Sequence, residues 1–191
     1  GEKWRKIPVP NNSIVRSLAI DTSGVIYAGV VGDFGLLKTD ITGNVYYNSL
    51  KYLVQDSIKE FSDVWKTYVI NGNVYFCSIE YIFRYDGKSI KCIPQPPLVV
   101  FTFLIDTNLY VGDYKNGLRC VNQDFKIVQG GEFYSKKGIY TIDKFDNKFL
   151  VGTNPEGMFF YNPMDGISSK AFENTPADRK STRLNSSHGK L

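Results

Sequence analysis

The chain has 191 residues, of which 42% are hydrophobic and 15% aromatic, with a formal net charge of +4. No window approaches the run of about 18 apolar residues that a membrane span requires, and the first residues, "GEKWRK", lack a signal-peptide pattern. The chain does not begin with Met, so we interpret its start as an internal cut, and these absences exclude nothing about a longer parent protein. Thirteen Tyr and thirteen Phe, with Val and Ile, favour strands over helices.

The first segment with strand-like patterning is "SLAIDTSGVIYAGVVGDFGLLKTD", which begins at Ser17. It contains Asp33-Phe34-Gly35, the tripeptide by which protein kinases hold magnesium. A kinase site would also need a catalytic-loop Asp and Asn, a Lys facing ATP and a Gly-rich loop, and none occurs at a suitable distance. We therefore interpret the tripeptide as a turn between two strands.

Three further segments repeat this pattern of an apolar run, a short turn, a second strand and a third strand. They begin at Thr67, Phe101 and Ile139, and the Asn71-Gly72 turn of the first is a strong hairpin signal. "NVYYNSL", "SIKCIP" and "KIVQGG" supply fourth strands. The second strands are marked by residues at intervals of 48, 35 and 40, near the period of a propeller blade: Tyr27, Tyr75, Tyr110 and Leu150.

These repeats predict an all-β fold, a β-propeller of about four blades with four antiparallel strands each. Residues 1–177 are expected to form a partial propeller, an incomplete fragment of a larger, seven-bladed ring. Only "LKYLVQDSIKEF" (50–61) has the pattern of a short helix. The predicted blades cover about 12–50, 62–95, 99–130 and 137–172.

The last residues, 178–191, are interpreted as a non-native, disordered tail, because "DRKSTRLNSSH" looks like a translated sequencing adapter. Without them the chain keeps 19 basic and 18 acidic residues, so we expect no nucleic-acid partner. The only histidine, His188, also lies in this tail. Residues 1–177 therefore lack a histidine for general base catalysis or metal binding.

Three cysteines, Cys77, Cys92 and Cys120, show no Cys-x-x-Cys spacing. Cys77 and Cys120 lie in strand-like runs and are expected to be buried free thiols, although a disulfide is also compatible with the sequence. "DKFDNK" lacks the alternating oxygen ligands of a calcium loop. We expect no metal and no cofactor.

Four stretches resemble the two-component regulator propeller repeats of bacterial sensor proteins. They are "VRSLAIDTSGVIYAGVVGDFGLL", "FSDVWKTYV", "IFRYDGKSIK" and "GGEFYSKKGIYTI", and the resemblance covers about residues 4–172. Departures are Cys77, where the other segments have Gly, and Tyr27 and Tyr75, where Trp is common in the family.

The resemblance implies a non-catalytic, ligand-sensing domain in the periplasmic or extracytoplasmic part of a membrane-anchored two-component sensor. Its expected partners are a small-molecule or carbohydrate ligand, the remaining blades and the downstream signalling domains, with no membrane contact in this segment. The parent would carry a histidine kinase or cyclase output. A protein-interaction scaffold and a carbohydrate-active propeller enzyme are the alternatives, since propellers host all three functions.

Candidate ligand-binding residues lie in the predicted loops, where polar and aromatic groups suit a sugar. A solvated turn explains most of these positions equally well, and Trp65 also suits packing between blades. The candidates are Asp33, Phe34, Asp63, Trp65, Asp113, Tyr114, Lys115, Glu132, Asn154 and Glu156.

Overall fold

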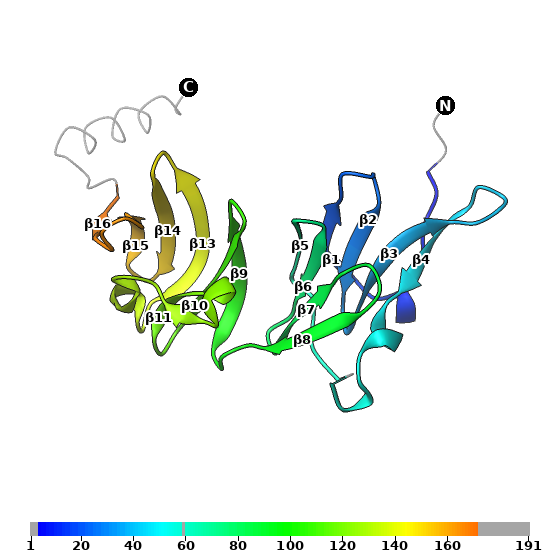
Figure 1. Ribbon diagram of the computed structural model, residues 1–191, viewed down its shortest axis with the longest axis horizontal. Helices are drawn as coiled ribbons and strands as arrows, with labels where there is room; N and C mark the ends of the chain where they lie inside the picture. The colour runs from blue at the N-terminus through cyan, green and yellow to red at the C-terminus, as the bar shows by residue number, and fades with distance from the viewer. Residues whose placement is uncertain (1–3, 59, 172–191) are drawn as a thin grey trace, which may run out of the picture.

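The structure is a computed structural model that describes residues 4–58 and 60–171. These residues form four separate four-stranded antiparallel sheets, each with its strands in sequence order, and no α-helix occurs among them. The predicted all-β fold of four-stranded propeller blades is confirmed. Figure 1 shows the blades side by side, blades 1 and 2 as one pair and blades 3 and 4 as another.

Blades 1 and 2 come from the N-terminal half of the described chain. Blade 1 consists of β1 (Val15–Ile20), β2 (Ile26–Val30), β3 (Asp33–Thr39) and β4 (Val45–Ser49). Blade 2 consists of β5 (Lys66–Ile70), β6 (Asn73–Cys77), β7 (Tyr81–Tyr85) and β8 (Ile90–Pro94). The predicted hairpin at Asn71-Gly72 joins β5 to β6 with φ angles of 49° and 76°, so both residues adopt the positive φ that such a turn requires.

Blades 3 and 4 follow with the same topology. Blade 3 consists of β9 (Val99–Ile105), β10 (Asn108–Asp113), β11 (Gly117–Cys120) and β12 (Lys126–Ile127). Blade 4 consists of β13 (Gly138–Phe145), β14 (Lys148–Asn154), β15 (Gly157–Tyr161) and β16 (Ser168–Lys170). The first strands of successive blades contact one another, β1 with β5, β5 with β9 and β9 with β13. These four are therefore the inner strands of the propeller.

Short 3₁₀-helices occur outside the sheets: η1 (Pro10–Asn12), η2 (Lys51–Leu53), η3 (Asp56–Ile58), η4 (Val121–Gln123) and η5 (Gly131–Tyr134). Two of them, η2 and η3, replace the helix expected over 50–61. "KIVQGG" yields a strand of two residues before η5 begins, shorter than expected. All three cysteines are free thiols, with Cys77 and Cys120 buried.

Two aromatic cores hold the blades together in pairs. The core between blades 1 and 2 centres on Phe34, whose ring lies 4.6 Å from that of Phe76 and 4.8 Å from that of Phe83. The core between blades 3 and 4 includes Tyr134 from η5 and Tyr161 from β15, with ring centroids 6.1 Å apart. Each cluster draws its residues from one pair of blades, so burial of aromatic area stabilises the pairs separately.

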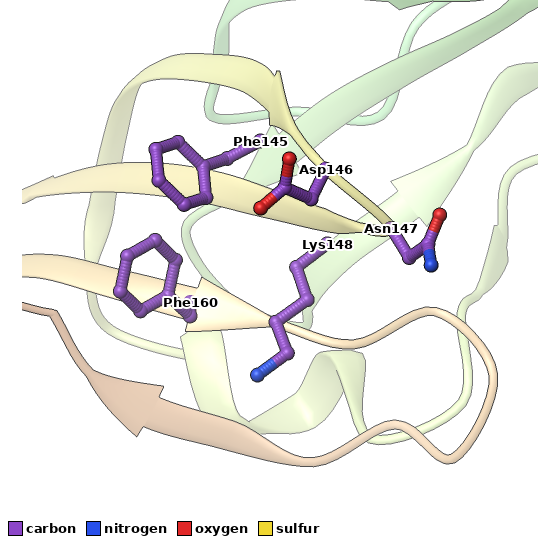
Figure 2. Close-up of a pocket in the computed structure, with 5 residues that line it drawn as sticks. All are labelled: Phe145, Asp146, Asn147, Lys148 and Phe160. Carbon is purple, nitrogen blue, oxygen red and sulfur yellow. The ribbon is translucent and has the colours of Figure 1, made fainter.

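The faces of blades 1 and 4 that point away from these cores carry exposed apolar side chains. On blade 1 they are Leu18, Ile20 and Ile26. On blade 4, Phe145 and Phe160 lie with ring centroids 5.1 Å apart, and Figure 2 shows them beside Lys148. The shallow pocket at this place has a volume of about 230 Å³, below the roughly 300–1,000 Å³ of typical ligand pockets. We therefore treat it as part of an open sheet face.

Candidate functional site

The loops after β2, β6 and β10 and the connections between blades meet at one end of the propeller, which we call the connector end. Hydrogen bonds tie the two kinds of segment together, because each connection returns past the loop of the preceding blade. Lys51 Nζ donates to Gly32 O at 2.8 Å, Gln95 N donates to Glu80 O at 2.9 Å, and Lys136 N donates to Tyr114 O at 2.7 Å. All ten predicted site residues lie at or near this end.

A row of planar side chains runs across the inner strands near the connector end. The Arg16 guanidinium lies 4.6 Å from the ring centroid of Trp65. Trp65 meets Phe101 edge to face at 6.2 Å, and Phe101 meets Tyr140 at 6.1 Å. We call these four residues the inner row. One residue comes from each blade, so the inner row joins all four.

Bulges in the inner strands place these side chains. Arg16 and Tyr140 are the extra residues where the registers of β1 and β13 shift, and Phe101 lies within the shift of β9. Trp65 directly precedes β5. Because a bulge turns a side chain away from regular alternation, it can present a ring at the rim of the sheet.

Asp63 fixes the charged end of the inner row. Its Oδ2 accepts a hydrogen bond of 2.6 Å from Arg16 Nε, and the side chains of Arg16 and Asp63 keep 30% and 18% of their exposure. Two predicted site residues thus contact Arg16, Asp63 by an ion pair and Trp65 by its ring. Tyr140, at the other end of the row, is 57% exposed. The row offers a ring face and hydrogen-bonding groups together, an arrangement that suits a sugar.

The interpretation of Asp33-Phe34-Gly35 as a turn, and of Phe34 as a loop residue for a ligand, is wrong. Val31 and Gly32 make the turn, and Asp33 begins β3. Phe34 is fully buried, since its ring fills the core between blades 1 and 2.

Asp33 is also buried rather than solvated. Its carboxylate accepts hydrogen bonds from Tyr47 Oη at 2.9 Å and from Ser49 Oγ at 2.9 Å. Burial raises the pKa of Asp33, and these two hydrogen bonds oppose the rise. Such a group braces β3 against β4 and is not free to meet a ligand.

Asp113 is also a buried structural residue, at the corresponding place in blade 3. Its Oδ1 accepts from the backbone N–H of Lys115 and Asn116 at 2.9 and 3.1 Å, which closes the turn after β10. Arg119 Nε lies 2.8 Å from Asp113 Oδ2, at ion-pair distance but without hydrogen-bond geometry. Asp113 is only 2% exposed, so the prediction that it lies in an open loop is wrong.

The other candidates remain at the surface. Tyr114 and Lys115 are exposed on the turn after β10, Glu132 is exposed in η5, and Asn154 and Glu156 are exposed around the turn after β14. The connection after η5 brings two of these turns together: Lys137 Nζ lies 3.5 Å from Glu156 Oε1, and Ser135 Oγ donates to Lys115 O at 2.9 Å. Ligand binding by these five residues stays a prediction.

Sequence reasoning found Trp65 and Asp63 but missed Arg16, Phe101 and Tyr140. A bulge leaves no trace in composition or in alternation. The four inner strands nevertheless share a signal, a large planar side chain close to the start of the apolar run, in "VRSLAI", "WKTYVI", "FTFLID" and "YTIDKF". Aligning those starts would have identified the row.

Within residues 4–58 and 60–171, no group of three or more His, Cys, Asp or Glu side chains could hold a metal ion. The described part of the chain also contains no helix with the length and apolarity to cross a membrane.

Solved structures with similar folds include natural and designed proteins. The extracellular domain of a B. thetaiotaomicron protein, described as a hybrid two component system, superposes with a TM-score of 0.60 at 20% identity, over 91% of this chain and 23% of that one. Virginiamycin B lyase from Staphylococcus aureus superposes with a TM-score of 0.58 at 14% identity, over 88% of this chain and 58% of the lyase. The computationally designed Ika4 protein superposes with a TM-score of 0.57 at 12% identity, over 85% of this chain and 98% of the designed one.

No family model and no curated protein matches the sequence. At identities of 20% or less, the similar structures establish the propeller fold and leave function open. The chain spans less than two thirds of the lyase structure and about a quarter of the two-component extracellular domain.

Proposed function

We propose that this chain is a ligand-sensing propeller domain from the extracytoplasmic part of a bacterial signal-transduction protein. The inner row is the observation that carries the proposal, because it combines the exposed ring of Tyr140 and two partly buried rings with a guanidinium held by an ion pair. Aromatic faces stack on the apolar face of a sugar, and Arg16 and Asp63 supply hydrogen-bonding groups beside it. The fold shared with an extracellular domain of a two-component system supports the same role.

Signalling requires that the ligand bind one arrangement of the domain more tightly than another. The inner row crosses from blade 2 to blade 3 through the contact of Trp65 with Phe101. A ligand seated on the row would therefore contact both pairs of blades and favour one relation between them. The downstream domains, a histidine kinase or cyclase output in this proposal, would read that change.

Further blades of the same protein would cover the apolar outer faces of blades 1 and 4. Exposed patches that include Leu18, Ile20 and Phe145 are the kind of surface that neighbouring propeller blades bury. The remaining blades are thus proposed as partners.

A fluorescence titration tests the proposed ligand class. The chain has two tryptophans, Trp4 and Trp65, so Trp65 is the only one in a Trp4→Phe background. This substitution should leave the fold intact, because Trp4 is almost fully exposed. We expect one or more members of a panel of neutral oligosaccharides to change Trp65 emission saturably. Tyr140→Ala should weaken that binding at least about tenfold, a loss of about 1.4 kcal/mol. Tyr46→Ala, an exposed tyrosine on β4, should leave it unchanged.

Three results would redirect the proposal. Equal weakening by Tyr140→Ala and Tyr46→Ala would remove the inner row as the site. Binding of a protein but of no saccharide would favour an interaction scaffold instead. Turnover of a bound saccharide would favour a carbohydrate-active enzyme, the remaining alternative.

A further inference from the structure

A groove separates the outer parts of blades 2 and 3, away from the inner row. It has a volume of about 370 Å³, within the range of small-molecule sites. Blade 2 contributes side chains from β6, β7 and β8, and blade 3 contributes Leu109 and the segment around η4. Of the residues that line the groove, only Cys92 also packs against an aromatic core, the one between blades 1 and 2.

Two cations face this groove from adjacent strands. Arg84 of β7 is paired directly opposite Lys91 of β8, and Tyr75 of β6 is opposite Arg84 on its other side. Directly opposed residues of an antiparallel pair point to the same face, with Cβ atoms about 4.5–5.5 Å apart. Like charges in this position repel each other, so the pair costs stability unless an anion lies between them.

Neither cation is neutralised by the described chain. No ion pair of Arg84 or Lys91 with another described residue occurs. Arg84 Nε is inaccessible to solvent and has no hydrogen-bond partner, although a buried polar group of this kind normally has one. Arg84 thus has an unused donor and no anionic partner among the described residues, and Lys91 adds a second unpaired charge beside it, which points to a missing acceptor.

The blade 3 wall does not supply that acceptor. Asn122 already accepts from Leu109 N at 2.8 Å and donates to Thr107 O at 3.4 Å. Asp124 is the one acidic side chain that lines the groove, and it makes no ion pair across it. The two cations thus outnumber the acid, and the groove has a net positive lining.

We propose that this groove binds an oxyanion, the carboxylate or sulfate group of a small molecule, between Arg84 and Lys91. The guanidinium fork matches such a group with two parallel hydrogen bonds, and the ammonium adds a point charge. Tyr75 supplies a ring beside the pair for the rest of the ligand. This site is independent of the inner row and of the proposed sensing role.

An NMR titration of the full chain tests the proposal directly. The ¹⁵N-bound Nε proton of Arg84, assigned by its loss in Arg84→Met, should shift saturably as an anion binds the guanidinium. Sodium sulfate and sodium glucuronate distinguish a free anion from one carried by a sugar, and neutral glucose is the uncharged comparison. Sodium chloride keeps the ionic strength constant, because exposed charges also respond to salt.

The variants separate a built site from general attraction. Arg84→Met should abolish saturable binding. Lys91→Met should weaken it about tenfold and leave the fold intact, because Lys91 is exposed. Arg84→Lys, which keeps the charge but loses the fork, should weaken binding more than twofold. Lys88→Met, on the turn between the same two strands, should keep the affinity within twofold.

Binding of either anion with these variant effects supports the site, and the tighter of the two identifies the source of the oxyanion. An unchanged Arg84 signal with both anions would overturn the proposal. So would equal affinity for glucose and glucuronate, or equal weakening by Lys88→Met and Lys91→Met.

Discussion

Blade 2 packs against its two neighbours through faces of different chemistry. Toward blade 1 it presents Phe76 and Phe83, which pack on Phe34. Toward blade 3, the same strands present Tyr75 and Arg84, while Tyr68 Oη donates to Thr102 O at 2.7 Å. One side of this sheet is therefore an apolar core, and the other is polar and opens into a groove.

This difference follows from alternation along each strand and has a consequence for function. Successive residues of β6 and β7 point to opposite faces, so one sheet can make a fixed contact on one side and an adaptable one on the other. Both the inner row and the cationic groove cross the junction of blades 2 and 3. Ligand-dependent change is expected there, where less apolar area opposes it.

The largest effect is expected in the apolar core. Phe34→Ala should lower the free energy of unfolding of blades 1 and 2 by about 3–5 kcal/mol, because a fully buried ring leaves a cavity. Urea unfolding followed by hydrogen exchange checks this. Amides of β6 should lose protection, while those of β14 keep theirs, since the second core contains no residue of blade 1 or 2.

Phe145→Ala on the outer face of blade 4 is the matched control. Phe145 is 46% exposed, so the same truncation should cost less than about 1.5 kcal/mol. Equal losses in the two variants, or loss of protection throughout both pairs after Phe34→Ala, would contradict the division into two separately stabilised pairs.

A second variant tests a buried charge at the edge of the apolar side. Asp33→Asn should cost about 1–3 kcal/mol near pH 4, because Ser49 Oγ also lies 3.0 Å from Asp33 Oδ2, which an amide nitrogen cannot replace as an acceptor. Burial raises the folded-state pKa of Asp33, so the folded protein binds its proton more tightly than the unfolded chain. Wild-type stability from this group is then greatest below the ordinary pKa and falls as the pH rises above it.

The measurement is the free energy of unfolding of both proteins at pH 4 and pH 7. The difference between wild type and Asp33→Asn should be smaller at pH 7. A difference that grows from pH 4 to pH 7 would instead mean that the two hydroxyl groups lower the pKa more than burial raises it.

A third variant probes the polar side of blade 2. Tyr68→Phe removes the hydrogen bond to Thr102 O and should cost about 0.5–1.5 kcal/mol, less than the core truncation. The exchange of amides in β9 reports whether the junction loosens. Tyr46→Phe on β4, which is exposed, should change neither quantity, and a cost above about 3 kcal/mol for Tyr68→Phe would make the junction as rigid as the cores.

The repeat explains why the blades could be predicted and these contacts could not. Period-two alternation, Asn71-Gly72 and the recurring aromatic positions are local signals, and they lead to the observed sheets. Which face of a sheet meets which neighbour depends on how blades stack. Phe34 shows this limit. The stretch "GDFG" has the composition of a loop, yet the Phe34 ring fills a core formed with blade 2.

The contacts of the candidate site were predicted in part for the same reason. Asp63 and Trp65 stand out in "FSDVWK", but their partner Arg16 lies 47 residues earlier than Asp63, on another blade. Asp33 and Asp113 were expected at the surface as polar turn residues, yet both are buried: Asp33 accepts from hydroxyl groups of β4, and Asp113 accepts from the backbone of its own turn. Partners that the sequence pattern does not identify decide whether a polar residue is exposed.

The smallest effect is expected at an ion pair between blades 3 and 4. Lys144 Nζ lies 2.8 Å from Asp106 Oδ1, but both side chains are more than half exposed. Water and salt screen such a pair, so Lys144→Ala should change the free energy of unfolding by less than about 1 kcal/mol, and by less still at 1 M salt. Lys170→Ala, an exposed lysine on β16, is the control. A loss from Lys144→Ala that rivals Phe34→Ala and persists at high salt would mean that charge, and not the aromatic core, joins blades 3 and 4.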